Sequence, residues 1–239
     1  MFNLFDISTF VEAASSYAEN IDFLVLLVAV LVGLPFLIAE GLLFGFVIKS
    51  LKKDGVKAVY IDGTKHEHKK WVEWPHYLVL AFDVVIIYFA VQVWVDVKQD
   101  LPPLPENSGD EYVIGINARQ WMWNFTHAGP DKKLGTADDI RTTNTLHVEK
   151  DKVYHFKLTS EDVLHDFSVP VFRLKQDVVP GREITGWFKA TKEGVHDIQC
   201  AEMCGIGHGI MGAKIIIEGT EAYASWQAKR VSGELPINQ

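Results

Sequence analysis

The chain has 239 residues, a formal net charge of −8 and 48% hydrophobic residues. This modest acidic balance argues against nucleic acid as a partner. Its two cysteines lie together in one short segment, which excludes a fold held by a framework of disulfides.

Two long apolar runs come first in chain order. Residues 21–48 are almost entirely apolar, with Glu40 as the one charge past Asp22, and they are long enough to cross about 30 Å of hydrocarbon as a helix. Residues 77–95 are apolar apart from Asp83 and Gln92, and they also suffice for one crossing. We therefore expect a transmembrane helical hairpin over residues 21–98. A buried hairpin of a soluble protein is the alternative, which the length of the first run disfavours.

Charge predicts the topology of this hairpin. The loop over residues 49–70 is rich in lysine, which places it in the cytoplasm, or in the matrix of an organelle. Residues 1–20 contain no Lys or Arg, so the first run lacks the basic region of a cleavable signal peptide. We expect residues 1–20 and the C-terminal part on the opposite side. A bacterial inner membrane with a periplasmic C-terminal domain is favoured over a mitochondrial inner membrane with this domain in the intermembrane space.

A proline-rich linker over residues 99–109 separates the hairpin from the rest of the chain. Beyond it, short runs rich in Val, Ile, Thr and aromatic residues alternate with turn residues, which predicts an all-β sandwich or barrel. Examples of the expected strands are 111–117, 145–148, 153–158, 183–188, 194–199 and 213–218. A short helix is expected at 221–230, with Thr220 as its N-cap.

The segment 200–211 reads Cys-Ala-Glu-Met-Cys-Gly-Ile-Gly-His-Gly-Ile-Met. Two thiolates, an imidazole and a thioether form a soft ligand set of the kind that selects copper. His165 falls between two expected strands, and loops at one end of a sandwich can meet, so it is a further candidate ligand. Two alternatives remain open: a Cys200–Cys204 disulfide, and a Cys₂His₂ zinc site that would leave Met211 without a role. Blue mononuclear copper uses one thiolate, whereas two thiolates can bridge two copper ions.

These motifs resemble the copper-A signature of subunit II of the haem-copper oxidases. The pattern Cys-x-Glu-x-Cys-Gly-x-x-His-x-x-Met and the upstream Asp-Val-Leu-His carry the resemblance. Residues 120–123 (Gln-Trp-Met-Trp) and 174–182 (Leu-Lys-Gln-Asp-Val-Val-Pro-Gly-Arg) are similar to two further family segments. Met122, where the family usually has tyrosine, and an insert at 127–144 are departures. The resemblance implies a cupredoxin-like copper-A domain over residues 110–239.

The resemblance also implies roles for single residues. Cys200 and Cys204 would bridge the two coppers, and His165 and His208 would ligate one copper each. The axial ligands would be Met211 and the backbone oxygen of Glu202, whose carboxylate would reach a Mg²⁺ shared with subunit I. Trp121 would be the point where electrons enter from cytochrome c. The alternative for Trp121 and Trp123 is packing in the sandwich core.

The implied function is electron entry into a terminal oxidase. The chain would accept single electrons from cytochrome c or a cupredoxin and pass them to haem in subunit I, which reduces O₂ and pumps protons. No Cys-x-x-Cys-His motif occurs, so no c-type haem is expected on this chain. The alternatives are a copper subunit of a nitric oxide reductase, a quinol oxidase subunit without copper, and a zinc-stabilised, membrane-anchored binding domain.

Several acidic residues and histidines carry weaker expectations. Glu161, Asp162 and Asp177 could steer a basic donor, or be ordinary solvated loop charges. Glu73 resembles, weakly, a family glutamate at the entry of a proton path, while Glu40 and Asp83 are expected to make polar contacts with a partner subunit. The insert residues Asp131, Asp138 and Asp139 suggest Ca²⁺ or a polar surface turn, without the EF-hand spacing. Surface or hydrogen-bonded positions are expected for His66, His68, His127, His147, His155 and His196.

Overall fold

The computed structural model describes residues 11–51 and 60–235. The chain divides into two compact units. One consists of Asn20–Val95, and the other combines the residues before it with Asp96 onward.

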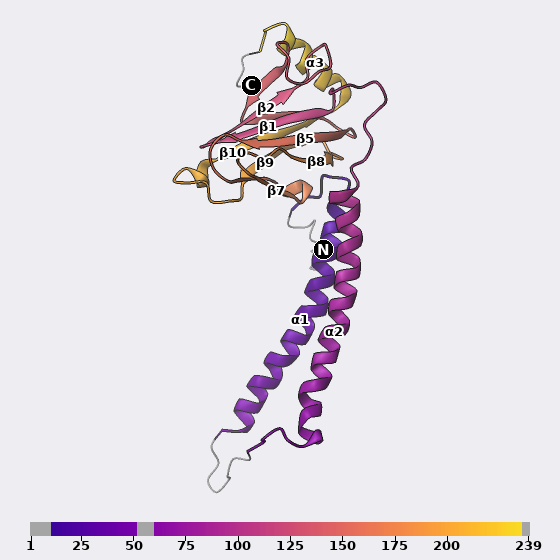
Figure 1. Cartoon of the computed structure of the whole chain (residues 1–239), viewed down its shortest axis with the longest axis vertical. Helices are drawn as coiled ribbons and strands as arrows, with labels where there is room; N and C mark the ends of the chain where they lie inside the picture. Colours follow the sequence, from indigo (N-terminus) through magenta and orange to yellow (C-terminus); the bar gives the residue numbers. More distant parts are fainter. Residues whose placement is uncertain (1–10, 52–59, 236–239) are drawn as a thin grey trace. The chain divides into compact units, whose positions relative to one another are not determined.

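The helical unit is a pair of long antiparallel helices, α1 (Ala18–Lys49) and α2 (His66–Trp94) (Figure 1). The rings of Phe23 and Phe89 meet edge to face, with centroids 5.4 Å apart, and so fasten the start of α1 to the end of α2. Both helices are long and apolar enough to cross a membrane, and their apolar windows are not buried within the protein. The predicted hairpin of two apolar helices is confirmed. Helix α2 starts well before the apolar run, because polar residues such as Lys69 and Lys70 continue the same helix.

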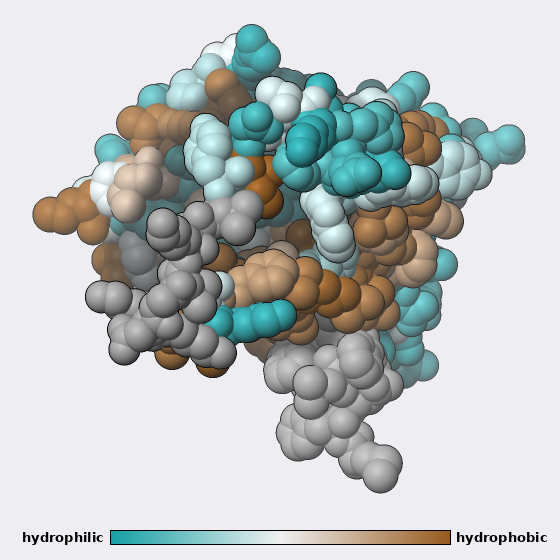
Figure 2. Space-filling model, turned by 90° about the horizontal axis from the view of Figure 1, so that it is seen from below, coloured by the Kyte–Doolittle hydropathy of each residue, from teal (hydrophilic) through white to brown (hydrophobic). Residues whose placement is uncertain are grey.

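Exposed large apolar side chains are concentrated on the two long helices. Figure 2, a view from below, shows a wide brown area of apolar side chains beside teal polar ones. On the helices, large apolar side chains such as Leu37, Phe46 and Ile87 are more than half exposed. Such continuous apolar surface needs lipid or a partner to cover it.

The second unit is a β-sandwich of two five-stranded sheets (Figure 1). The first sheet has the order β3-β2-β1-β5-β8, and the second has the order β4-β10-β9-β6-β7. Parallel pairs β1–β5 and β10–β4 sit among antiparallel ones. The strands of the first sheet are β1 (Val113–Arg119), β2 (Met122–His127), β3 (Ile140–Thr143), β5 (Val153–Ser160) and β8 (Ile184–Lys189). Those of the second are β4 (Thr145–Glu149), β6 (His165–Val169), β7 (Leu174–Val178), β9 (Gly194–Cys200) and β10 (Gly212–Glu218).

Aromatic side chains fill the space between the two sheets. The rings of Trp123 and Phe167 meet at 5.4 Å, and Phe125, Phe156 and Phe188 complete a fully buried cluster. Each such ring removes a large apolar area from water, so this cluster is a main source of stability for the sandwich. The all-β sandwich expected from the sequence is confirmed.

The segment before α1 belongs to the β-sandwich. Ser15 pairs with Ala190 in an isolated β-bridge, and the Ser15 hydroxyl donates to the Phe172 carbonyl at 2.9 Å. On the linker side, the Trp187 indole donates to the Val97 carbonyl at 3.0 Å and packs edge to face on Tyr17. The sandwich therefore holds both the chain segment that precedes α1 and the segment that follows α2.

The C-terminal helix α3 runs from Thr220 to Val231. Its N-cap is Gly219 rather than Thr220, so the predicted cap is wrong. Thr220 is instead the first residue of the helix, and its hydroxyl donates to a carboxylate oxygen of Glu149 on β4 at 2.6 Å.

Beneath α3 lie two buried histidines. Trp226 of α3 stacks on His147 and meets His127 edge to face. His147 is 6% exposed with Nδ1 2.9 Å from Glu218, whereas His127 is 2% exposed and neither ring nitrogen has a hydrogen-bond partner. The expectation of a surface or hydrogen-bonded position is therefore wrong for His127. Its ring is buried and packs edge to face with Trp226 of α3.

His127 predicts a loss of stability in acid. Desolvation, together with the nearby His147 and Arg230, lowers the pKa of His127 to about 3, below the value near 6.5 of an unfolded histidine. The unfolded state thus binds more protons, so this contribution to stability is present above pH 6.5 and is lost as the pH falls towards 3. Between pH 6.5 and 4.5 the loss should be about 2 kcal/mol.

This can be measured by urea unfolding of the metal-free full chain in detergent at several pH values, with His127→Leu beside the wild type. The variant should lose less stability on acidification than the wild type does. The control is His66→Leu, because His66 is exposed on α2. Parallel pH profiles for wild type and His127→Leu would contradict the prediction.

Candidate metal centre

The second sheet brings the separated ligand candidates to one end of the sandwich. His165 is the first residue of β6, and Cys200 is the last residue of β9. These two strands pair antiparallel, with Phe167 opposite Cys200, so the start of one strand meets the end of the other. The loop after Cys200 then returns to β10 at Gly212 through a short 3-10 turn at His208–Ile210.

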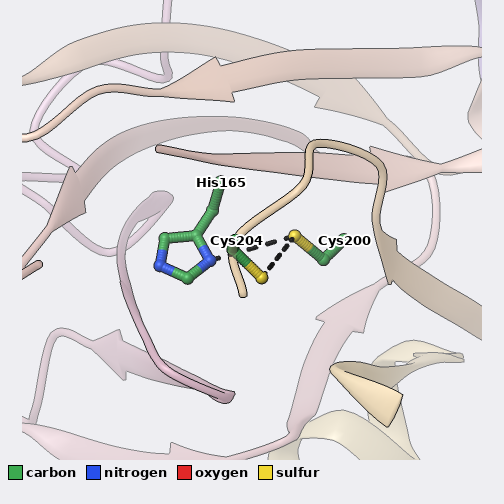
Figure 3. A group of neighbouring side chains, drawn as sticks. All are labelled: His165, Cys200 and Cys204. Atoms are coloured by element: carbon green, nitrogen blue, oxygen red, sulfur yellow. Dashed lines mark hydrogen bonds between the residues drawn. The ribbon is translucent and has the colours of Figure 1, made fainter. Parts of the chain in front are cut away.

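The two thiols lie at the middle of the candidate site. Their sulfur atoms point toward one another at 3.7 Å, and the His165 ring turns its Nδ1 toward them, 3.9 Å from the Cys200 sulfur (Figure 3). The carbonyl oxygen of Glu202 is 3.3 Å from the Cys200 sulfur. The Cys204 sulfur lies 3.7 Å from Nδ1 of His208 and 3.8 Å from the Met211 sulfur. Each thiol thus has one imidazole and one weaker ligand atom beside it.

The chemistry of this donor set fits a metal. A disulfide would need the sulfurs about 2.05 Å apart, and both cysteines are free in this structure. Burial and the adjacent Cys200 raise the pKa of the Cys204 thiol to about 11, so without a cation the thiol form is favoured. Metal coordination reverses this preference, because a coordinating thiol is deprotonated outright. Within residues 11–51 and 60–235, His165, Cys200 and Cys204 each offer one ligand atom, and these three atoms lie close enough together to share one ion.

A carboxylate outside the ligand set holds His165 in place. Asp162 accepts a hydrogen bond from His165 Nε2 at 2.9 Å, which leaves Nδ1 facing the sulfurs. It also accepts from the backbone N–H groups of Gln120 and Val163, at 2.7 and 2.6 Å. A carboxylate of this kind fixes the orientation of a metal-binding histidine. Asp162 is thus an exposed residue whose carboxylate is tied to His165, rather than a free surface charge.

The other acidic residues predicted near the site differ in their surroundings. Glu161 is exposed, and Asp177 lies opposite Asp166 in the β6–β7 ladder. Burial raises the pKa of Asp166 to about 6, and the neighbouring Asp177 and Glu202 add to this rise against the opposing charge of Lys175. This cluster of carboxylates could not be predicted from the sequence, because it depends on how β6 and β7 pair.

Trp121 lies against the cysteine loop. Its indole N–H and the side-chain amide of Gln120 both donate to the carbonyl of Cys204, at 3.3 and 2.8 Å. A methyl group added at Gly207 would overlap the Trp121 ring, so the loop backbone and the indole are in direct contact. Trp123 is fully buried in the sandwich core. The core-packing interpretation therefore holds for Trp123, whereas Trp121 contacts the loop that carries Cys204.

The carboxylates of the insert accept hydrogen bonds from backbone N–H groups of their own loop. Asp131 accepts from the N–H of Lys133 at 2.9 Å, Asp138 from the N–H of Asp131 at 3.1 Å, and Asp139 from that of Gly135 at 3.0 Å. Among the described residues, these three do not form a group close enough to share one ion. A Ca²⁺ site here stays a prediction.

The acidic residues of the helices lie in the described part of the hairpin. Glu40 is on α1, and Glu73 and Asp83 are on α2, where both are exposed. Their predicted roles need a partner subunit and stay predictions.

The model of the cytochrome c oxidase subunit II periplasmic domain matches residues 113–220, the sandwich and every candidate ligand. Residues 113–220 are thus similar to the periplasmic domain of cytochrome c oxidase subunit II. It is 36% identical over 148 residues to an alternative cytochrome c oxidase subunit 2 of Bradyrhizobium diazoefficiens, covering 52% of this chain and 53% of that protein. It is 35% identical over 125 residues to subunit 2 of Thermostichus vulcanus, covering 52% of this chain and 35% of that protein.

The chain thus spans about half or less of the length of these subunit II relatives. Among solved structures, it is similar to the periplasmic domain of cytochrome oxidase subunit II of Bradyrhizobium japonicum, with a TM-score of 0.48 and 27% identity. That match covers 56% of this chain and 99% of the other. The similarity of residues 113–220 to a subunit II domain points to a copper centre, and the set of two thiols, two imidazoles and a thioether fits it.

Proposed function

We propose that this chain is the electron-entry subunit of a haem-copper oxidase, with a dinuclear copper centre bridged by Cys200 and Cys204. The observation that carries the proposal is the two-fold pattern around the thiols. Cys200 has His165 and the Glu202 carbonyl beside it, and Cys204 has His208 and Met211. This arrangement therefore supplies one imidazole and one weak ligand for each of two metal ions.

Copper held by two thiolates supplies one-electron redox chemistry when bound. The protein's own contribution is a preorganised site. Three of the five ligand side chains, those of His165, Cys204 and Met211, are almost completely buried. Asp162 fixes His165, and Gln120 and Trp121 fix the carbonyl of Cys204. A rigid, largely dry site limits rearrangement when an electron arrives or leaves.

Trp121 is the proposed entry point for the electron. Its ring is half-buried, so it faces both the surface and the loop, and its N–H donates directly to Cys204. The donor is proposed to be cytochrome c or a cupredoxin. Of the acidic residues predicted to steer it, Glu161 and Asp177 are exposed enough for this role, whereas Asp162 is engaged with His165.

Subunit I is the proposed acceptor and partner in the membrane. The Glu202 carboxylate is proposed to reach a Mg²⁺ shared with it, and Glu73 to lie at the entry of a proton path. Relatives of this chain are cytochrome c oxidase subunits, which favours O₂ rather than nitric oxide as the final acceptor of the complex. A bacterial inner membrane, with the sandwich in the periplasm, is the proposed location.

Metal analysis of the full chain in detergent tests this function. After incubation with copper and removal of excess metal, we expect two copper ions per chain, near-infrared absorption and a mixed-valence electron paramagnetic resonance signal. A single zinc, or no bound metal after exposure to both, would overturn the proposal.

A further inference from the structure

We infer that Gln120 is a positioning residue that joins the two ligand-bearing loops of the candidate copper site to one rigid turn. This inference rests on the proposed function for its meaning, but it is carried by contacts of the protein alone. Gln120 forms a turn with Trp121 between β1, which ends at Arg119, and β2, which begins at Met122. Because Arg119 and Met122 are paired directly across the ladder, the turn is held by the sheet.

Two hydrogen bonds leave Gln120 in different directions. Its backbone N–H donates to Oδ2 of Asp162 at 2.7 Å, and the other oxygen of that carboxylate is 2.9 Å from His165 Nε2. Its side-chain Nε2 donates to the carbonyl of Cys204 at 2.8 Å. One residue thus connects the carboxylate that orients His165 with the backbone of Cys204.

The cysteine loop is shaped to admit the Gln120 amide. A methyl group added at Gly205 would come within 2.8 Å of Gln120 Nε2, and the φ angle of Gly205 is +117°, which side chains rarely adopt. Glycine at this position therefore lets the backbone approach the amide closely. The Cys204 carbonyl has two lone pairs, and Gln120 and Trp121 each donate to it. The bond from Gln120 is the shorter of the two.

Through these two bonds, Gln120 should affect a metal bound by the thiols in two ways. It fixes the spacing between His165 and Cys204, on which retention of the metal depends. It also aims the positive end of an amide dipole at the residue that supplies a thiolate, which favours the reduced form. Loss of the side-chain amide should therefore weaken metal retention and lower the reduction potential.

The test compares the full chain in detergent as wild type, Gln120→Leu and Gln120→Glu. The glutamate variant keeps the size of the side chain and removes the donor, so it should lose the bond to Cys204 as the leucine variant does, and its negative charge should lower the midpoint potential further. For the copper-loaded chain, we expect release of copper to a chelator to be faster by about 10-fold, as for other hydrogen-bond partners of metal ligands. The midpoint potential should fall, and the electron paramagnetic resonance spectrum should change. Gln227→Leu on α3, where the amide contacts Tyr223, is the matched control.

A measurement on the metal-free chain keeps this inference separate from the proposed function. Hydrogen exchange of the backbone amides in residues 201–210 should be faster in both Gln120 variants and unchanged in the Gln227→Leu control. Failure of the wild type to bind copper would overturn the function, while faster exchange in the variants would still support the role of Gln120. Wild-type exchange in both Gln120 variants, or wild-type copper release and potential in both, would overturn the inference.

Discussion

Replacing Cys204 with serine should abolish the proposed dinuclear copper centre and lower the rate of electron uptake from cytochrome c, the proposed donor, by at least about 100-fold, because the residue acts as part of one unit. Its sulfur lies within 3.8 Å of the Cys200 sulfur, His208 Nδ1 and the Met211 sulfur, so it is the atom that joins most of the set. A hydroxyl is a harder ligand and does not bridge soft metals in the same way. Copper stoichiometry, the mixed-valence spectrum and rapid-mixing kinetics with reduced cytochrome c measure the effect.

Two methionines of the same loop provide graded controls for this result. Met211→Leu keeps the volume of a buried side chain and removes only its weak sulfur ligand, so copper should stay bound with a changed potential. Met203 is 71% exposed, and Met203→Leu should leave the copper spectrum unchanged. Two bound coppers with an unchanged spectrum in Cys204→Ser would show that this sulfur is not a bridge.

Replacing Gly207 with alanine should separate Trp121 from the cysteine loop and slow electron uptake by about 10-fold or more, since small displacements of positioned groups carry large rate costs. The added methyl group would overlap the indole ring, so either the ring or the loop backbone must move. Rapid-mixing kinetics with a reduced donor, read beside copper content and spectrum, would show the loss. Retained copper with slow uptake is the expected combination.

Gly209→Ala is the matched control for this prediction. A methyl group at Gly209 meets nothing within 4 Å, although the residue lies in the same loop close to Gly207. Equal rates of electron uptake in the two alanine variants would mean that contact between Trp121 and the loop is not needed for electron entry.

The regular parts of the fold could be predicted from the sequence because their signals are local. Both long helices follow from unbroken apolar runs, and strands with alternating burial, such as β5 and β10, were expected near their observed positions. Strand β6 was missed because all five of its residues are buried, so its sequence His-Asp-Phe-Ser-Val shows no alternation. Strand β3 has four residues, which is too short for a clear pattern.

The candidate ligands could be predicted because four of them lie in one segment and the fifth lies in a motif. Their supporting partners could not. Gln120 reaches Cys204 only because the β1–β2 turn lies over the cysteine loop, and no local pattern encodes that approach. The sequence predicts only a loop charge at Asp162, since its bond to His165 depends on how the loop before β6 folds. The sequence predicts a surface or hydrogen-bonded position for His127, because a histidine in a strand gives no sign that a helix will cover it.

The bridge between Ser15 and Ala190 has a practical consequence for making soluble material. A fragment cut just after the membrane helices would retain the ligands but lack Ala14 and Ser15, which are buried against the sandwich. It would expose the Phe172 carbonyl and the strand edge at Ala190 that this short stretch now covers. An expression design that fuses residues 11–17 to the linker would keep that edge closed and discourage strand-to-strand aggregation.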